Sequence, residues 1–229
     1  RFMRGLDSEG NWRTPFNPRA SNHRNDDYCE GTAWQWTWFV PHDVDGLVEL
    51  MGGRDAFIGK LDSLFTADSK LEGESTSVDI SGLIGQYAHG NEPSHHIAHL
   101  YNYVGQPWRT QEIVDEVLHT LYFNNPDGLS GNEDCGQMSA WYILNAMGFY
   151  QVCPGKPVYS IGRPLFNEAT VHLKDGKSFK VIAHNNSRDN KYVRSIVLNG
   201  NKLETPFFTH QDIVDGGTLE LTMGSEPLK

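Results

Sequence analysis

Three polar segments of this chain each stand just before a stretch with helical patterning. Glu30 precedes GTAWQW, Asn91 and Glu92 precede PSHHIAHLY, and the acidic turn at residues 132–134 precedes CGQMSAWYILNAMG. Any one of them could be a helix cap, because such side chains accept backbone N–H bonds and anions suit the positive end of a helix. In a stack of antiparallel helices, alternate helices begin at the same end. Three such segments therefore also predict one acidic pocket.

Carboxylate and amide groups without cysteine partners suit two kinds of chemistry. One is proton transfer by a paired general acid and base. The other is binding of Ca²⁺, which takes oxygen ligands from Asp, Glu and amide side chains. No EF-hand loop is present, so a calcium site would have to be assembled from separate helix starts. Glu30 has the most aromatic sequence neighbourhood, which favours a protonated acid, whereas a helix start favours the ionised form.

The histidines and cysteines carry weaker signals. His95 and His99 have i, i+4 spacing, but without an HExxH motif we expect no zinc site. Cys29, Cys135 and Cys153 are an odd number without C-x-x-C spacing, which indicates neither a disulfide framework nor zinc. Cys135 has no histidine partner in the pattern, so we predict a small buried thiol there rather than a nucleophile.

Composition excludes several classes of protein. The 229 residues carry a formal net charge of −10. The chain therefore lacks the excess of positive charge that binding to nucleic-acid phosphates requires. No basic amphipathic helix, signal peptide or apolar run long enough to span a bilayer is visible. The chain opens with RFMRGLDSEG and no initiator Met, so we expect a fragment or a processed chain.

The hydrophobic period changes along the chain. Residues 1–29 are predicted to be a long ordered loop, and residues 66–88 a polar loop. From Gly31 to Gly148, apart from that polar loop, apolar residues recur with a period near 3.6. This pattern predicts about six helices, at residues 31–41, 42–53, 54–65, 93–105, 109–123 and 136–148. Alternation then predicts strands at residues 169–173, 178–184, 192–198 and 218–223, with hairpin turns at KDGK and LNGN. The predicted fold is mainly α with C-terminal β: a helical region at residues 1–153 and an antiparallel β region at residues 154–229.

Three motifs together resemble the C-terminal part of glycoside hydrolase family 92. They are YCEGTAWQWTWFVPHD, HGNEPSHHIAHLYNYVGQPWRTQ and GLSGNEDCGQMSAWYILNAMGFYQVCPG, and the opening RGLDSEGNWRTPFNP fits the same pattern. The resemblance implies an N-terminal β-sandwich followed by a catalytic (α/α)6 toroid and terminal strands. Six helices would then be half of the toroid, and the missing N-terminal half of the enzyme is an expected partner.

The resemblance also implies roles for individual residues. Glu30 matches the general acid and Asp134 the general base that activates water. Asn132 stands where some family members have a second acidic side chain, so a single base is expected. Calcium would be held by Asn91, Glu92 and Asp134. The expected substrate-binding residues are Gln35, Trp36, Asn91, Glu92 and His95.

The function implied by the resemblance is calcium-dependent, inverting, exo-acting hydrolysis of α-mannosides. The expected substrates are mannose-terminated glycans such as N-glycans or mannan, with α-1,2 linkages in first place, although the sequence does not determine the linkage. Family members are common in gut Bacteroidetes, which implies a periplasmic, cell-surface or secreted protein. Two alternatives stay open: an inactive carbohydrate-binding or structural fragment, and another (α/α)-toroid enzyme such as a lyase or phosphorylase.

Overall fold

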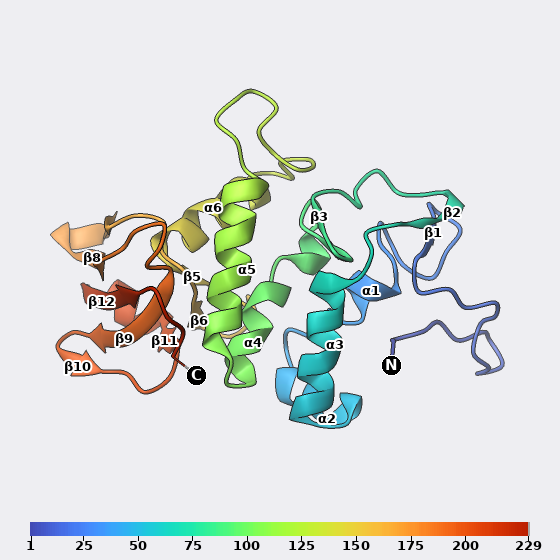
Figure 1. Cartoon of the computed structure of the whole chain (residues 1–229), viewed down its shortest axis with the longest axis horizontal. Coiled ribbons are helices and arrows are strands. Elements are labelled where there is room, and N and C mark those ends of the chain that lie inside the picture. Colours follow the sequence, from blue (N-terminus) through green and yellow to red (C-terminus); the bar gives the residue numbers. More distant parts are fainter. Residues whose placement is uncertain (229) are drawn as a thin grey trace. The chain divides into compact units, whose positions relative to one another are not determined.

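The computed structural model describes residues 1–228, which divide into two compact units (Figure 1). Unit 1 comprises Arg1–His95 and Asn124–Cys135. Unit 2 comprises His96–Phe123 and the chain from Gly136 onward. The predicted change from helices to strands near residue 154 is visible in the order of elements, but the compact units follow a different division, because two of the longer helices belong to the same unit as the C-terminal strands.

Unit 1 is built from short helices and strands in equal number. Residues before 20 have no regular strand or helix beyond one β-bridge between Leu6 and Trp12, as expected for a long loop. The elements are β1 (Ala20–Asn22), α1 (Ala33–Trp36), α2 (Val44–Met51), α3 (Arg54–Thr66), β2 (Glu72–Ser75), β3 (Leu83–Ile84), β4 (Tyr87–Ala88) and the 3₁₀ helix η1 (Glu92–Ser94). Strand β1 pairs in parallel with β2, which ties the N-terminal loop to the segment after α3.

The core of unit 1 lies under α3. Phe57, Leu61 and Leu64 are fully buried, and their i, i+4, i+7 spacing places them on one face of the helix. Trp38 packs edge-to-face against Phe57 with ring centroids 5.4 Å apart. The same core covers Tyr87 of β4, so the short hairpin that precedes Asn91 is anchored by apolar burial rather than by its own two-residue strands.

Unit 2 combines helices and sheets. Its elements are the 3₁₀ helix η2 (Ile97–His99), α4 (Leu100–Tyr103), α5 (Pro107–Thr120), α6 (Gln137–Met147), β5 (Phe149–Tyr150), β6 (Val158–Ile161), β7 (Glu168–His172), the 3₁₀ helix η3 (Lys174–Gly176), β8 (Ser178–His184), β9 (Tyr192–Leu198), β10 (Asn201–Lys202), β11 (Phe207–Thr209), α7 (His210–Val214) and β12 (Gly217–Gly224). Helical structure therefore occurs in all six predicted regions, and the four predicted strands are confirmed.

The predicted helix at residues 93–105 is broken into η1, η2 and α4. Tertiary contacts explain part of this difference, because they bury polar side chains that periodicity would leave at the surface. His99 is fully buried, with Nδ1 3.0 Å from Ser160 Oγ and Nε2 2.8 Å from Asn145 Oδ1. Burial lowers the pKa of His99 to about 4, so the ring is neutral at pH 7 and acts as a hydrogen-bonding core residue.

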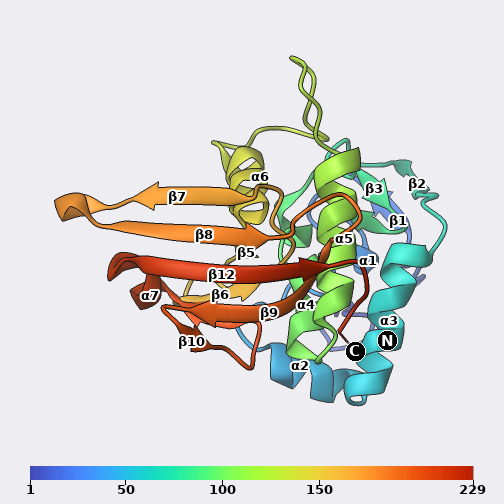
Figure 2. The same cartoon turned by 60° about the vertical axis from the view of Figure 1, so that its left-hand side comes forward.

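The main sheet corrects the prediction of a wholly antiparallel β region. Its strand order is β10-β9-β12-β8-β7, and Figure 2 shows these strands side by side. Strand β12 runs parallel to β8, from Gly217 opposite Phe179 to Thr222 opposite His184, and antiparallel to β9. Alternation identifies the buried face of a strand but not its direction. The direction of β12 follows from the connection through β10, β11 and α7, which returns the chain between β8 and β9.

A second sheet, β11-β6-β5, shares its core with the main one. Phe208 is central to it, because its ring lies 5.3 Å from that of Phe149 and 5.8 Å from that of Phe179. The predicted turns after β7 and β9 are confirmed, since Asp175 and Asn199 both take positive φ angles, of 60° and 49°.

Candidate active site

The turn that carries Glu30 is held by residues other than Glu30. Thr32 is the N-cap of α1, and the side chain of Gln35 closes a capping box by accepting from the Thr32 backbone N–H at 2.7 Å. Gln35 also donates to Gln86 O and is only 1% exposed. The structure thus assigns the capping to Thr32, and it places Gln35 inside unit 1, where its amide positions the turn.

Glu30 itself is exposed and has a φ angle of 51°, which non-glycine residues rarely adopt. Such backbone conformations persist where the surroundings impose them, and they cluster at functional sites. Trp36 contributes to those surroundings, because its indole Nε1 donates to Cys29 O at 2.7 Å. A Cβ at Gly31 would lie 2.7 Å from that same Nε1, so only glycine lets the indole pack so closely on the turn.

The segment at Asn91 and Glu92 is joined directly to this turn. Asn91 caps η1 by accepting from the Glu92 backbone N–H at 3.1 Å, as the capping interpretation predicts. Its Nδ2 donates to Glu30 O at 2.8 Å. Both ends of the Asn91 amide are therefore engaged, and the side chain fixes the backbone of Glu30 relative to that of Glu92.

The acidic turn is the end of the loop Asn124–Cys135, which packs on residues 79–90 of unit 1. Ser81 Oγ donates to Ser130 O, and a Cβ at Gly131 would lie 2.6 Å from Gly90 O. Glycine is required for this close approach of two backbones. Asn132 Nδ2 donates to Asp79 Oδ1 at 3.4 Å, so Asn132 is engaged with a residue that the sequence did not single out.

Asp134 and Cys135 follow with φ angles of 49° and 57°. The N-cap of α6 is Gly136, without a side-chain cap, so Asp134 is not a helix cap. Cys135 is exposed, which corrects the prediction of a buried thiol. The reason is that Cys135 precedes α6, whose first buried residue is Met138.

Three carboxylates meet in unit 1. Burial raises the pKa of Glu92, and the negative charges of Asp134 and Glu30, together with a hydrogen bond between the side chains of Glu92 and Asp134, raise it further. A hydrogen bond between two carboxyl groups requires that one of them carries the proton. Glu30, Glu92 and Asp134 are therefore neighbours, although 104 residues separate the first from the last.

His95 lies beneath this group. It is 2% exposed, its Nε2 donates to His89 O at 2.9 Å, and burial lowers its pKa to about 4 while the charge of Asp134 acts in the opposite direction. The imidazole is neutral at pH 7 and is buried within unit 1, close enough to Asp134 to be influenced by its charge. Of the predicted substrate-binding residues, Glu92 is one of the three carboxylates, Trp36 and Asn91 contact the turn that carries Glu30, and Gln35 bonds to Thr32 two residues further on.

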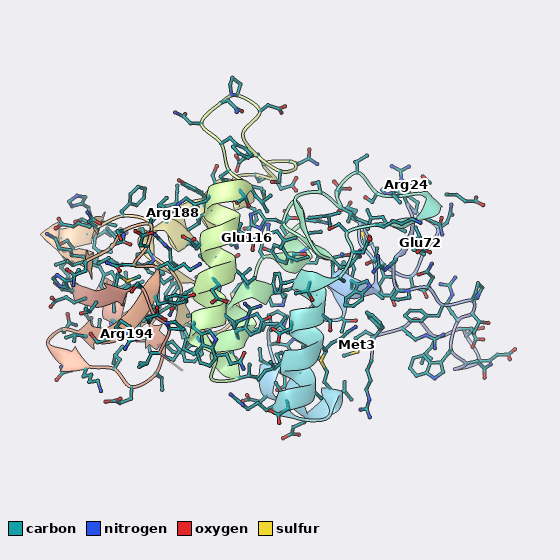
Figure 3. The ribbon with its side chains drawn as sticks, in the orientation of Figure 1. Met3, Arg24, Glu72, Glu116, Arg188 and Arg194 are labelled. Atoms are coloured by element: carbon teal, nitrogen blue, oxygen red, sulfur yellow. The ribbon has the colours of Figure 1, made fainter. Side chains whose placement is uncertain are left out.

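An open cavity of about 650 Å³ lies against Glu30. Glu92 and Asp134 are not among its walls, which are His23, Arg24, Asp26, Asp27, Tyr28, Cys29, Glu30, Val78 and Asp79. Arg24 projects from the turn after β1 (Figure 3). The sequence identified none of these walls except Glu30 as a site residue, because most of them belong to segments without hydrophobic periodicity.

The predicted calcium site has few oxygen donors in this structure. Among residues 1–228, no group of three His, Cys, Asp or Glu side chains is arranged to hold a metal ion. Glu92 and Asp134 nevertheless form a carboxyl pair whose shared proton a cation could replace, which suits a hard ion with oxygen ligands. Two carboxylates fall short of the six to eight ligands that Ca²⁺ takes, so carbonyl, water or sugar oxygens would have to supply the rest.

Comparison with known proteins gives one consistent relationship. Residues 1–225 match the family model of the glycosyl hydrolase family 92 catalytic domain. An uncharacterized secreted glycosidase of Arthroderma benhamiae is 32% identical over 200 residues, which are 86% of this chain and 24% of that protein.

Two solved structures from Bacteroides thetaiotaomicron, the α-mannosidase BT3965 in complex with mannoimidazole and the inverting mannosidase BT2199, are each 43% identical to this chain. They match it over 99% of its length with TM-scores of 0.92 and 0.84. The chain spans 30% and 31% of those two chains, and thus less than a third of the length of these relatives.

Proposed function

Since this chain belongs to glycosyl hydrolase family 92, we propose that it supplies the acid and base of an inverting, exo-acting α-mannosidase. The observation that carries the proposal is the meeting of Glu30, Glu92 and Asp134 around one hydrogen-bonded carboxyl pair. The mannosidase names of BT3965 and BT2199 support the substrate class, and the word inverting in the name of BT2199 supports the stereochemistry. Because the chain spans under a third of the length of these relatives, the activity proposed is that of the complete enzyme.

The proposed division of labour follows from position. Glu30 is exposed and borders the cavity of 650 Å³, so it faces the space where a leaving group fits and is the proton donor to the glycosidic oxygen. Asp134, which is hydrogen-bonded to Glu92, accepts the proton of the attacking water. Inversion follows when acid and base act on opposite faces of the sugar.

Glu92 and Asp134 are the residues proposed to hold Ca²⁺, and Asn91 positions both Glu92 and Glu30 through its two amide contacts. When bound, the ion would supply a positive charge that orients the sugar hydroxyl groups. The side chain of Trp36, packed on the Glu30 turn, offers an apolar ring of the kind that sugars pack against.

The decisive experiment is mannose release by the complete polypeptide. We expect it to release mannose from α-mannobiose, to lose that activity in EDTA and to regain it with added Ca²⁺. Proton NMR of the first product should show the β anomer before mutarotation. Binding of mannosides without turnover would favour the inactive-fragment alternative, and an unsaturated or phosphorylated product would favour another toroid enzyme. The secreted description of the A. benhamiae relative supports a site of action outside the cytoplasm, and no helix among the described residues is long and apolar enough to cross a membrane.

Glu92→Gln provides a test that does not depend on activity. The pKa of Glu92 in the folded protein is raised above its ordinary value of 4.5, so its contribution to stability is fully present below that value and is lost as pH rises through the folded pKa. A glutamine keeps the uncharged form at all pH values. In EDTA, the variant should therefore have a higher Tm than the wild type at pH 7 and an equal Tm near pH 4.

Added Ca²⁺ should raise the Tm of the wild type at pH 7 but not that of Glu92→Gln. The matched control is Glu74→Gln, a change at an exposed residue of β2. A variant that is destabilised equally at both pH values would contradict the proposed carboxyl pair. A variant that still gains stability from Ca²⁺ would place the ion elsewhere.

A further inference from the structure

A second cavity, of about 300 Å³, adjoins the one at Glu30. Its walls are Arg13, Thr14, Pro15, Phe16, Asn17, Ala20, Asn22, Asn25, Asp26, Asp27 and Tyr28. Residues 26–28 are walls of both cavities, so the two spaces border the same segment. Each has a volume within the range of ligand pockets, which is about 300–1,000 Å³.

The walls of the second cavity carry polar atoms that have no partner elsewhere among residues 1–228. The hydroxyl of Thr14, the side-chain amide of Asn25, Nδ2 of Asn22 and one carboxylate oxygen of Asp26 make no hydrogen bond within that part of the chain. The other Asp26 oxygen accepts from the Asn22 backbone N–H at 2.7 Å. Both donors and acceptors thus line the cavity, whose walls also include Phe16.

The cavity is held in shape by contacts outside it. Asn17 Nδ2 donates to Glu72 Oε2 at 2.6 Å, and β1 is paired with β2. The guanidinium of Arg13 pairs with Asp27, and the hydroxyl of Tyr28 donates to Met3 O. Pre-formed walls lower the entropy lost when a ligand binds.

The guanidinium of Arg4 lies over the Phe16 ring, 4.4 Å from its centroid. The rest of the ring, beside unpaired amide, hydroxyl and carboxylate groups, fits a neutral polyhydroxylated ligand. An anionic ligand fits less well, because Asp26 remains negatively charged once Arg13 is paired with Asp27. We infer that the cavity formed by residues 13–28 binds the second sugar on the leaving-group side, beyond a first sugar in the cavity at Glu30. This inference rests on the proposed function, and it makes the enzyme prefer oligosaccharides over disaccharides.

The test compares α-1,2-linked mannobiose with mannotriose, using the complete polypeptide. One or two sugar hydrogen bonds are worth about a 5- to 10-fold change in affinity. We expect kcat/KM to be higher by about that factor for mannotriose. Asn25→Ala and Thr14→Val should each remove most of this advantage and leave kcat/KM for mannobiose unchanged. Calorimetry in the Glu30→Gln background should show the same preference as a difference in Kd.

Matched controls are Asn124→Ala and Thr76→Val, changes at exposed residues of unit 1 outside both cavities. They should leave the ratio between the two substrates intact. Equal kcat/KM for both substrates, or an equal loss on both in Asn25→Ala, would overturn the inference while the proposed function stands. Release of mannose from neither substrate would instead be a failure of the proposed function itself.

Discussion

Replacing Asp134 by Asn lowers kcat for mannose release by about 1,000-fold, because general base catalysis contributes about 10²–10⁴-fold to such reactions. The amide has nearly the shape of the carboxylate but accepts no proton from water. The amide of Asn132, two residues earlier, is engaged with Asp79 and cannot act as a base, which leaves Glu133 as the other carboxylate of this turn. Initial rates on α-mannobiose measure the effect.

The control for this prediction is Glu133→Gln, which changes the adjacent exposed carboxylate of the same turn. It should retain most of the wild-type activity. A thermal melt of each variant separates loss of chemistry from loss of folding. Full activity in Asp134→Asn, or an equal loss in Glu133→Gln, would refute the assignment of Asp134 as the base.

Replacing Glu30 by Gln should lower kcat/KM for α-mannobiose by about 1,000-fold but affect an activated substrate far less. The leaving group of mannobiose is a sugar alkoxide, which needs a proton, whereas 2,4-dinitrophenolate leaves without one. The loss on 2,4-dinitrophenyl α-mannoside should therefore be about tenfold or smaller. The difference between the two losses, rather than either alone, identifies Glu30 as the proton donor.

Glu74→Gln serves as the control here as well, because it removes an exposed carboxylate of unit 1 that borders neither cavity. It should lose activity on neither substrate. An equal large loss on both substrates in Glu30→Gln would instead indicate that Glu30 binds the sugar or organises the turn. In that case, the acid would have to be sought in the carboxyl pair of Glu92 and Asp134.

The helices and strands were largely predictable because each depends on local spacing of apolar residues. The periodicity of α3, with Phe57, Leu61 and Leu64 on one face, is the same in the sequence and in the structure. The predicted helix at residues 93–105 failed to form in one piece for the opposite reason. Its buried polar residues form hydrogen bonds with distant parts of the chain: His99, for example, bonds to residues 46 and 61 positions away.

The candidate site was predictable only in part. The motifs around Glu30, Asn91 and Asp134 are contiguous in sequence, so each was visible as a unit. The sequence did not show whether their polar residues cap helices, because a cap is identified by the hydrogen bonds that it makes. The structure assigns capping to Thr32 and Asn91 and leaves Glu30 and Asp134 on strained turns outside the helices.

The sequence by itself therefore determined the order of helices and strands, the turns at Asp175 and Asn199, and the identity of three acidic segments with a common pattern. Tertiary structure alone decided that Glu30, Glu92 and Asp134 meet, that β12 lies parallel to β8, and that residues 13–28 enclose a cavity beside Glu30. The physical reason is the range of the forces involved. Local patterns record which face of an element avoids water, whereas proximity across a hundred residues depends on close packing such as that of Gly131 on Gly90, which leaves no periodic trace in the chain.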